Sequence, residues 1–183
     1  MKSQLTVGRM VGIVLAVLIA VAVANYDKLL PHSWQTYVAP DGTFSFELPG
    51  RPTVEQKPGA AEGGATRSIT MVSAQPTNGT IYMCSYFEDE SFENKSPDPV
   101  LESARDGSLH KTNGTLIHQE RLTVQGFPAL DLQARAGGNS LLDTRMILVG
   151  KRLYMIMAVT TSEEVREPKS VQRVLASFKI LKH

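Results

Sequence analysis

GFPALDLQARAGGNSLLDTRMILVGKRLYMIMAV, residues 126–159, sets the architecture of this chain and reads as three consecutive strands joined by two tight turns. From Ala129 to Ala136, apolar and polar residues alternate, and this period puts the two kinds on opposite faces of a strand. Gly and Asn at residues 137–140 favour the first turn, and Gly150-Lys151 fits a two-residue type II′ loop. The stretch therefore predicts an antiparallel meander.

The third strand of the meander, residues 152–160, is apolar on both faces. If Val149 pairs with Arg152, then Ile147 lies opposite Tyr154. One face of this strand carries Leu153, Met155, Met157 and Val159, and the other carries Tyr154, Ile156 and Ala158. Because a strand that is apolar on both sides is buried on both sides, we expect a covering layer on each face of the sheet.

Further strands and two helices surround the meander. The alternation of apolar and polar residues predicts strands at 34–38, 43–48, 67–73, 80–87 and 116–124, and a mobile Gly/Ala/Pro-rich loop at 56–65. The 116–124 strand is expected to carry on one face Leu116, His118, Glu120, Leu122 and Val124.

The two expected helices each begin at a proline signal. One helix takes Asp98 as its N-cap and runs to Thr112, and the other begins at Pro168. The second helix has a single apolar stripe at helical spacing, formed by Val171, Val174, Leu175 and Phe178.

Residues 1–27 read as a targeting segment, followed by a spacer at 28–33 and the domain at 34–183. Lys2 and Arg9 precede an uncharged apolar run at residues 10–24, which spans only about 22 Å as a helix. This is short of the hydrocarbon core of about 30 Å and at the upper limit of a signal-peptide apolar region, so both a membrane anchor and a signal peptide cleaved after Ala22 or Ala24 stay open. The membrane segment includes Met10, Ile13, Leu15, Leu18, Ile19 and Ala24. The flanking positive charges favour an extracytoplasmic domain, anchored in the inner membrane or, after cleavage, secreted or periplasmic.

The residues offer no catalytic, cofactor-binding or metal-binding constellation. The single cysteine, Cys84, lies in a strand pattern and is expected to be a buried structural thiol. The formal charge of +1 does not favour nucleic acid as a partner. Four charged residues project from adjacent strands, either as a ligand-recognising surface patch or as a cross-strand ladder of ion pairs. They are Asp131, Arg135, Asp143 and Arg145, and the register decides whether Asp131 faces Arg145 or Arg135 faces Asp143.

The segments DGTFSFELPGRP, GFPALDLQA, TRMILVGKRLYMIMAV and LASFKI together resemble the PsbP-like superfamily. That superfamily includes the extrinsic photosystem II subunit PsbP, a Ran-binding nuclear import factor and bacterial envelope proteins. The resemblance covers residues 34–181 and implies an α+β fold, with an antiparallel β-sheet sandwiched between helices. In this chain a hydrophobic N-terminal helix precedes that fold. The resemblance supplies no catalytic residue to transfer.

These observations predict a non-enzymatic, extracytoplasmic, membrane-anchored binding or assembly module with a protein partner and no cofactor. The alternative is a small-molecule or lipid-binding envelope protein with a pocket between sheet and helix. A core without a cavity of ligand size, about 300 Å³, would favour the first hypothesis over the second. A hydrolase without a local sequence signature is a third hypothesis.

Overall fold

The computed structural model describes residues 33–60, 66–76, 79–137 and 139–182, and places the domain that begins at Trp34 in one compact unit. Its strands are β1 (Trp34–Val38), β2 (Phe44–Pro49), β3 (Thr53–Ala60), β4 (Thr66–Ala74), β5 (Thr80–Glu88), β6 (Thr115–Val124), β7 (Phe127–Arg135), β8 (Leu141–Val149), β9 (Arg152–Thr160) and β10 (Lys179–Ile180). Its helices are α3 (Pro97–Thr112) and α4 (Pro168–Ser177), with short 3₁₀ turns η2 (Glu90–Phe92) and η3 (Glu163–Val165).

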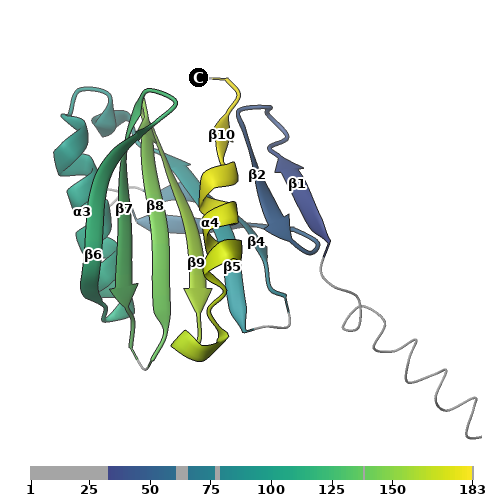
Figure 1. Ribbon diagram of the computed structural model, residues 1–183. Helices are drawn as coiled ribbons and strands as arrows, with labels where there is room; N and C mark the ends of the chain where they lie inside the picture. The colour runs from purple at the N-terminus through teal and green to yellow at the C-terminus, as the bar shows by residue number, and fades with distance from the viewer. Residues whose placement is uncertain (1–32, 61–65, 77–78, 138, 183) are drawn as a thin grey trace, which may run out of the picture. The chain divides into compact units, whose positions relative to one another are not determined.

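Two antiparallel sheets form the domain (Figure 1). The larger has seven strands in the order β3-β4-β5-β9-β8-β7-β6, and the smaller has three in the order β1-β2-β10. The predicted meander, now β7–β9, is confirmed, and so is its register: Val149 pairs with Arg152 and Ile147 with Tyr154. Gly150 adopts a φ of 55°, the left-handed conformation that its hairpin turn requires.

The seven-stranded sheet is covered on both faces, as its apolar third strand predicts. One face packs against α4 and β2, with Tyr154, Ile156 and the predicted stripe of α4 fully or almost fully buried. The other face packs against α3 through Val100, Leu101 and Leu153. Coverage is less complete on the α3 side, because Met155 is only half-buried there while Ile156 is 0 % exposed.

The small sheet is part of the layer that carries α4. Phe44, Phe46 and Leu48 of β2 point into the core, and the Phe44 ring stacks on Phe178 with 5.5 Å between centroids. The side chain of Gln125, in the β6–β7 turn, accepts from the Ile180 N–H at 2.7 Å and donates to the Ile180 carbonyl at 3.2 Å. The alternation of the first hairpin predicts its two strands, but not that they form a separate sheet.

Three local expectations are wrong. Residues 56–60, predicted as loop, belong to β3, because their backbone pairs with β4 from Thr53↔Ser73 to Ala60↔Thr66. Residues 61–65 lie outside the described residues. Helix α3 begins at Pro97 with Ser96 as N-cap, so Asp98 falls inside its first turn. The residues from Leu116 to Val124 that are expected on one face do not all lie there, because a β-bulge interrupts β6 between Leu116 and His118. Leu116 pairs with Ala134 and His118 pairs with Gln133, so Leu116 lies on the opposite face of the sheet.

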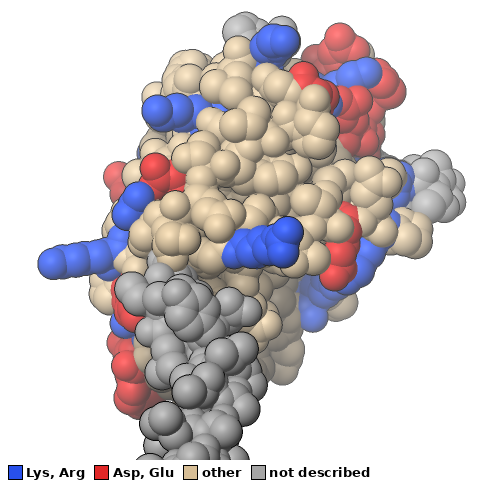
Figure 2. All heavy atoms as spheres, turned by 90° about the vertical axis from the view of Figure 1, so that its right-hand side faces the viewer, with Lys and Arg blue, Asp and Glu red and all other residues tan. Residues whose placement is uncertain are grey.

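The predicted membrane segment, residues 10–24, lies outside the described residues. In the described ranges, no helix is both long and apolar enough to cross a membrane. Figure 2 shows the face on the β1 side of the domain, where basic and acidic side chains intermingle with uncharged surface. This mixture agrees with the near-neutral formal charge.

Candidate functional site

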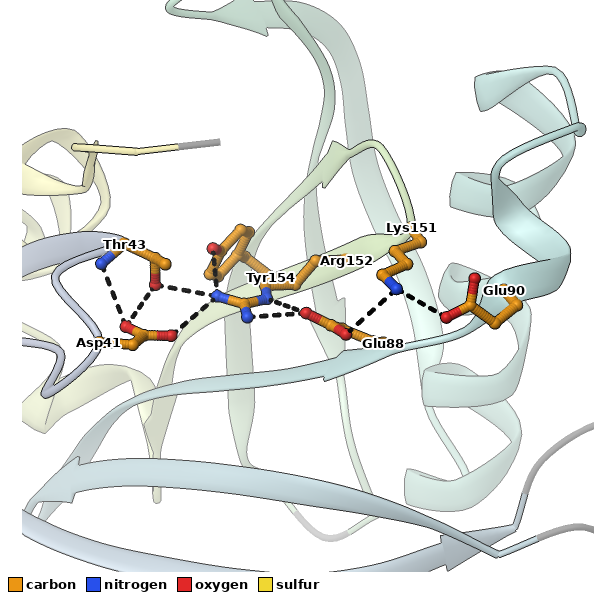
Figure 3. A network of polar contacts seen from close by, with 7 residues as sticks. All are labelled: Asp41, Thr43, Glu88, Glu90, Lys151, Arg152 and Tyr154. Atoms are coloured by element: carbon orange, nitrogen blue, oxygen red, sulfur yellow. Dashed lines mark hydrogen bonds and ion pairs between the residues drawn. The ribbon is translucent and has the colours of Figure 1, made fainter.

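Arg152, the first residue of β9, is the centre of a polar network (Figure 3). Its Nε and Nη2 donate to one oxygen of Glu88 at 3.0 and 2.7 Å. Its Nη1 donates to the Thr43 hydroxyl at 2.9 Å and to the Tyr154 hydroxyl at 3.2 Å, and lies 3.3 Å from a carboxylate oxygen of Asp41. One guanidinium thus joins groups from separate segments of the chain.

The fold supplies each partner of Arg152 for a local reason. Glu88 is its register partner at the end of β5, directly across the ladder between β5 and β9. Asp41 and Thr43 come from the β1–β2 turn, where Asp41 accepts from the Thr43 backbone N–H at 3.1 Å and from its hydroxyl at 2.7 Å. The Arg152 network therefore connects the small sheet to the large one.

Charge and burial act against each other in the network. Burial alone would raise the pKa of Asp41, but the hydrogen bonds from Thr43 and the nearby Arg152 outweigh it and hold that pKa below its ordinary value. For Tyr154, burial is the larger effect and raises the pKa of the phenol. The Arg152 guanidinium also lies 5.4 Å from the centroid of the Tyr86 ring and 5.9 Å from that of Tyr154. Arg152 is thus a fixed cation with little freedom to move.

The network forms one wall of a cleft of about 530 Å³, here called the Arg152 cleft. Lys151 extends the network along the rim, with its ammonium 2.6 Å from Glu90 and 3.8 Å from Glu88. The cleft combines aromatic and aliphatic surface with charges of both signs; its lining is Thr43, Glu88, Glu93, Phe127, Val149, Gly150, Lys151, Arg152, Tyr154 and Lys182. An arginine and a tyrosine beside apolar surface are the composition that dominates binding energy at protein interfaces.

A second cleft, of about 550 Å³, lies between α3 and the sheet and is here called the α3 cleft. Arg67 enters it with its guanidinium 4.4 Å from the centroid of the Phe87 ring and 2.9 Å from a carboxylate oxygen of Asp89. The pKa of Asp89 lies below its ordinary value, chiefly because the Ser91 side chain donates to the carboxylate. The other lining residues are mostly apolar: Phe92, Lys95, Pro99, Val100, Ser103, Ala104 and Leu153.

The four sequence-predicted patch residues lie on the α4 side of β7 and β8, and three of them are held by bonds within the fold. Asp131 pairs with Arg145, the first of the two registers considered, through two hydrogen bonds of 2.7 Å. Arg145 also donates to the Leu175 carbonyl of α4 at 3.1 Å. Asp143 is 6 % exposed and accepts from Arg166 at 2.9 and 2.8 Å.

Arg135, the fourth patch residue, pairs in register with Leu141, and its guanidinium lies 3.7 Å from Glu163. The predicted residues therefore come together as neighbouring ion pairs that fix α4 and the segment before it. Among the described residues, no group of three or more His, Cys, Asp or Glu side chains is arranged to hold a metal ion.

The Arg152 network was missed from the sequence, because its partners are distant along the chain. The meander places Arg152 opposite Val149, but only the pairing of β5 with β9 brings Glu88 beside it. A usable signal existed: Glu88 directly follows the predicted strand at 80–87 and Arg152 begins another, so an antiparallel pairing of the two strands would match their charges.

No protein-family model matches the sequence, and none of the curated proteins matches it either. Among solved structures, the domain is similar to the solution structure of cyanobacterial PsbP (CyanoP) from Synechocystis sp. PCC 6803. That match has a TM-score of 0.57 and 14 % sequence identity, and covers 83 % of this chain and 95 % of the other. A protein of unknown function from Pseudomonas aeruginosa matches with a TM-score of 0.36 and 15 % identity, over 70 % of this chain and 83 % of the other. The domain that begins at Trp34 therefore has a PsbP-like fold.

Proposed function

We propose that this protein is a non-enzymatic binding module of the cell envelope, and that the Arg152 cleft is where a protein partner docks. The observation that carries the proposal is a fixed arginine, held by Glu88, Thr43 and Tyr154, in the wall of an open cleft of about 530 Å³. Binding to a preorganised surface requires little ordering of side chains, so more of the contact energy becomes affinity.

The charges on the cleft rim suggest what the partner presents there. Glu93 and Lys182 are exposed side chains of opposite sign in the lining. A partner segment that carries both charges beside an apolar or aromatic anchor would complement this surface, and such complementarity mainly determines specificity and association rate.

The test is photocrosslinking in the native host from a benzoylphenylalanine placed at Glu93 in the full-length chain. The matched control carries the same group at Lys57, an exposed residue of the β3 edge outside the cleft lining. We expect one discrete adduct from position 93 and none of that mass from position 57. Equal adducts from both positions, or none from either, would contradict the proposed docking site.

The domain is further proposed to lie outside the cytoplasm, where residues 10–24 tether it or cleavage after Ala22 or Ala24 releases it. Lys2 and Arg9 before an uncharged apolar run support this topology. Fractionation of cells followed by N-terminal sequencing distinguishes the two versions, since only cleavage produces a new N-terminus. A full-length protein in the soluble cytoplasmic fraction would contradict both.

A second candidate function is small-molecule binding in the α3 cleft, and the size of that cleft favours it. Its volume of about 550 Å³ falls in the range of about 300–1,000 Å³ typical of ligand sites. Titration with the anionic fluorophore anilinonaphthalene sulfonate tests it. Ser103→Trp, at the exposed side of the cleft lining, should abolish saturable binding, whereas Lys111→Trp, on the same helix outside the lining, should not. Unchanged binding in the Ser103→Trp variant would exclude the α3 cleft.

A further inference from the structure

The outer edge of β6 is an exposed end of the seven-stranded sheet. In the described part of the chain β6 pairs only with β7, and its residues Thr115–Arg121 are all exposed. Leu116 and Ile117 are 36 % and 50 % exposed although both are apolar. An unpaired edge leaves a row of backbone N–H and C=O groups available to another strand.

The two edges of this sheet differ in how they are protected. The opposite edge, β3, contains Pro58, which lacks a backbone N–H, and the ion pair of Lys57 with Glu55 at 2.8 Å. The ten residues of β6 contain no proline, glycine or lysine. The β6 bulge lies between Leu116 and His118 and leaves the run from His118 to Val124 in regular register. The β6 edge is therefore able to accept another strand where the β3 edge is not.

We propose that β6 pairs antiparallel with β6 of a second copy of this chain, about a two-fold axis at Gln119. Such an axis, perpendicular to the sheet, sets one residue opposite its own copy and its neighbours opposite each other. At Gln119 it places His118 opposite Glu120 of the second copy, twice by symmetry. Both side chains lie on the α4 side of the sheet, since their partners in β7 are Gln133 and Asp131.

Charge complementarity favours this register over those with the axis at Glu120 or Arg121. An axis at Glu120 would set two carboxylates opposite each other, and an axis at Arg121 would set two guanidinium groups opposite each other. Both arrangements are destabilising, because like charges in opposite positions repel. An axis closer to the β6–β7 turn would shorten the paired length and leave Glu120 without a basic neighbour. Arg121 is already paired on the α3 side with Asp98 and Glu102, so its charge stays compensated in the Gln119 register.

Disulfide trapping tests the pairing in the full-length chain expressed in its native host. With Gln119→Cys, the two new thiols would face each other across the axis, where opposite Cβ atoms are about 4.5–5.5 Å apart. The native Cys84 is buried and will not contribute. The matched control is Thr123→Cys, which in this register lies eight residues from its own copy, about 26 Å at 3.3 Å per residue. We expect copper phenanthroline to give a disulfide-linked dimer from position 119, at least about tenfold more than from position 123.

Charge reversal provides a second test, in which the yield of the disulfide-linked dimer should depend on the charges at positions 118 and 120. In the Gln119→Cys background, Glu120→Lys should lower the dimer yield, because the lysine then faces His118 of the second copy. Adding His118→Glu should restore it. The proposal would be overturned by the absence of a dimer from position 119, or by equal dimer yields from positions 119 and 123. It would also be overturned by an adduct whose mass is not twice that of the chain, or by a yield that stays low when both changes are present.

Discussion

At the scale of single residues, Arg152 carries more of the architecture than its place in a hairpin suggests. Its donors reach Glu88 in the large sheet and Thr43 beside the small one. Its pKa, which burial alone would lower, is raised by hydrogen bonds with Tyr154 and Glu88. A lysine at this position could not replace the planar set of donors that serves all these partners.

Arg152→Met should lower the free energy of unfolding by about 1.5–3 kcal/mol, because Glu88 and Asp41 lose the donor they share. Arg152→Lys should recover less than half of that loss. The control is Arg121→Met on β6, whose partners Asp98 and Glu102 are on the surface, so its cost should be about 0–1 kcal/mol. Urea unfolding measures the free energy of unfolding of each variant. Equal losses for Arg152→Met and Arg121→Met would contradict the special role of Arg152.

The lowered pKa of Asp41 makes stability depend on pH in a defined direction. A carboxylate with a folded-state pKa below its unfolded value of about 3.9 stabilises the fold above that value, and the contribution disappears as the pH falls through the folded-state pKa. Asp41→Asn should therefore lose stability at neutral pH and show a flatter decline below about pH 4 than the unchanged chain. The measurement is the urea midpoint of the variant and of the unchanged chain as a function of pH, from neutral to acidic. Parallel curves for the two proteins would show that Asp41 does not contribute to the pH dependence of stability.

At the scale of elements, the sequence predicts best where burial alone dictates the pattern. The stripe of α4 and the two apolar faces of β9 follow from periodicity, and both are confirmed. The bulge in β6 and the strand at residues 56–60 could not be predicted, because each depends on the backbone of a neighbouring strand. The Arg152 network depends on several segments at once, so no local pattern indicates it.

The unequal coverage of β9 leads to a prediction for its two faces. Ile156→Ala removes a fully buried side chain beneath α4 and should cost about 2–5 kcal/mol. Met155 is half-buried on the α3 side, so Met155→Ala should cost less, below about 2 kcal/mol. Urea midpoints measure the difference. A larger cost for Met155→Ala would mean that the α3 layer covers β9 more fully than the structure shows.

Helix α4 is an integral layer of the core. Deleting residues from Pro168 onward would uncover Tyr154 and Ile156 and remove the Leu175 carbonyl that accepts from Arg145. We expect the shortened chain to aggregate, whereas deleting residues 182–183 should leave it folded. Gel filtration and urea unfolding distinguish the two. A monomeric, cooperatively folding protein without α4 would identify the helix as a detachable element.

At the scale of the whole molecule, a domain with a PsbP-like fold follows an apolar N-terminal segment in the sequence, and the face in Figure 2 carries charges of both signs. The large sheet with its two layers provides a rigid support for the two clefts. Both clefts lie beside ion pairs that hold distant segments together, Arg152 with Glu88 and Arg67 with Asp89. A recognition surface built from residues that also stabilise the fold is expected for a module that binds without large rearrangement.

The central proposal is that the protein partner docks at the Arg152 cleft. The most direct measurement is the yield of the photocrosslinked adduct from position 93 in cells, compared between Lys182→Glu and Lys57→Glu. Each variant reverses the charge at one exposed lysine, but only Lys182 lines the Arg152 cleft. We predict that the adduct is lost with Lys182→Glu and kept with Lys57→Glu. An adduct that survives both changes, or disappears with both, would contradict the proposal.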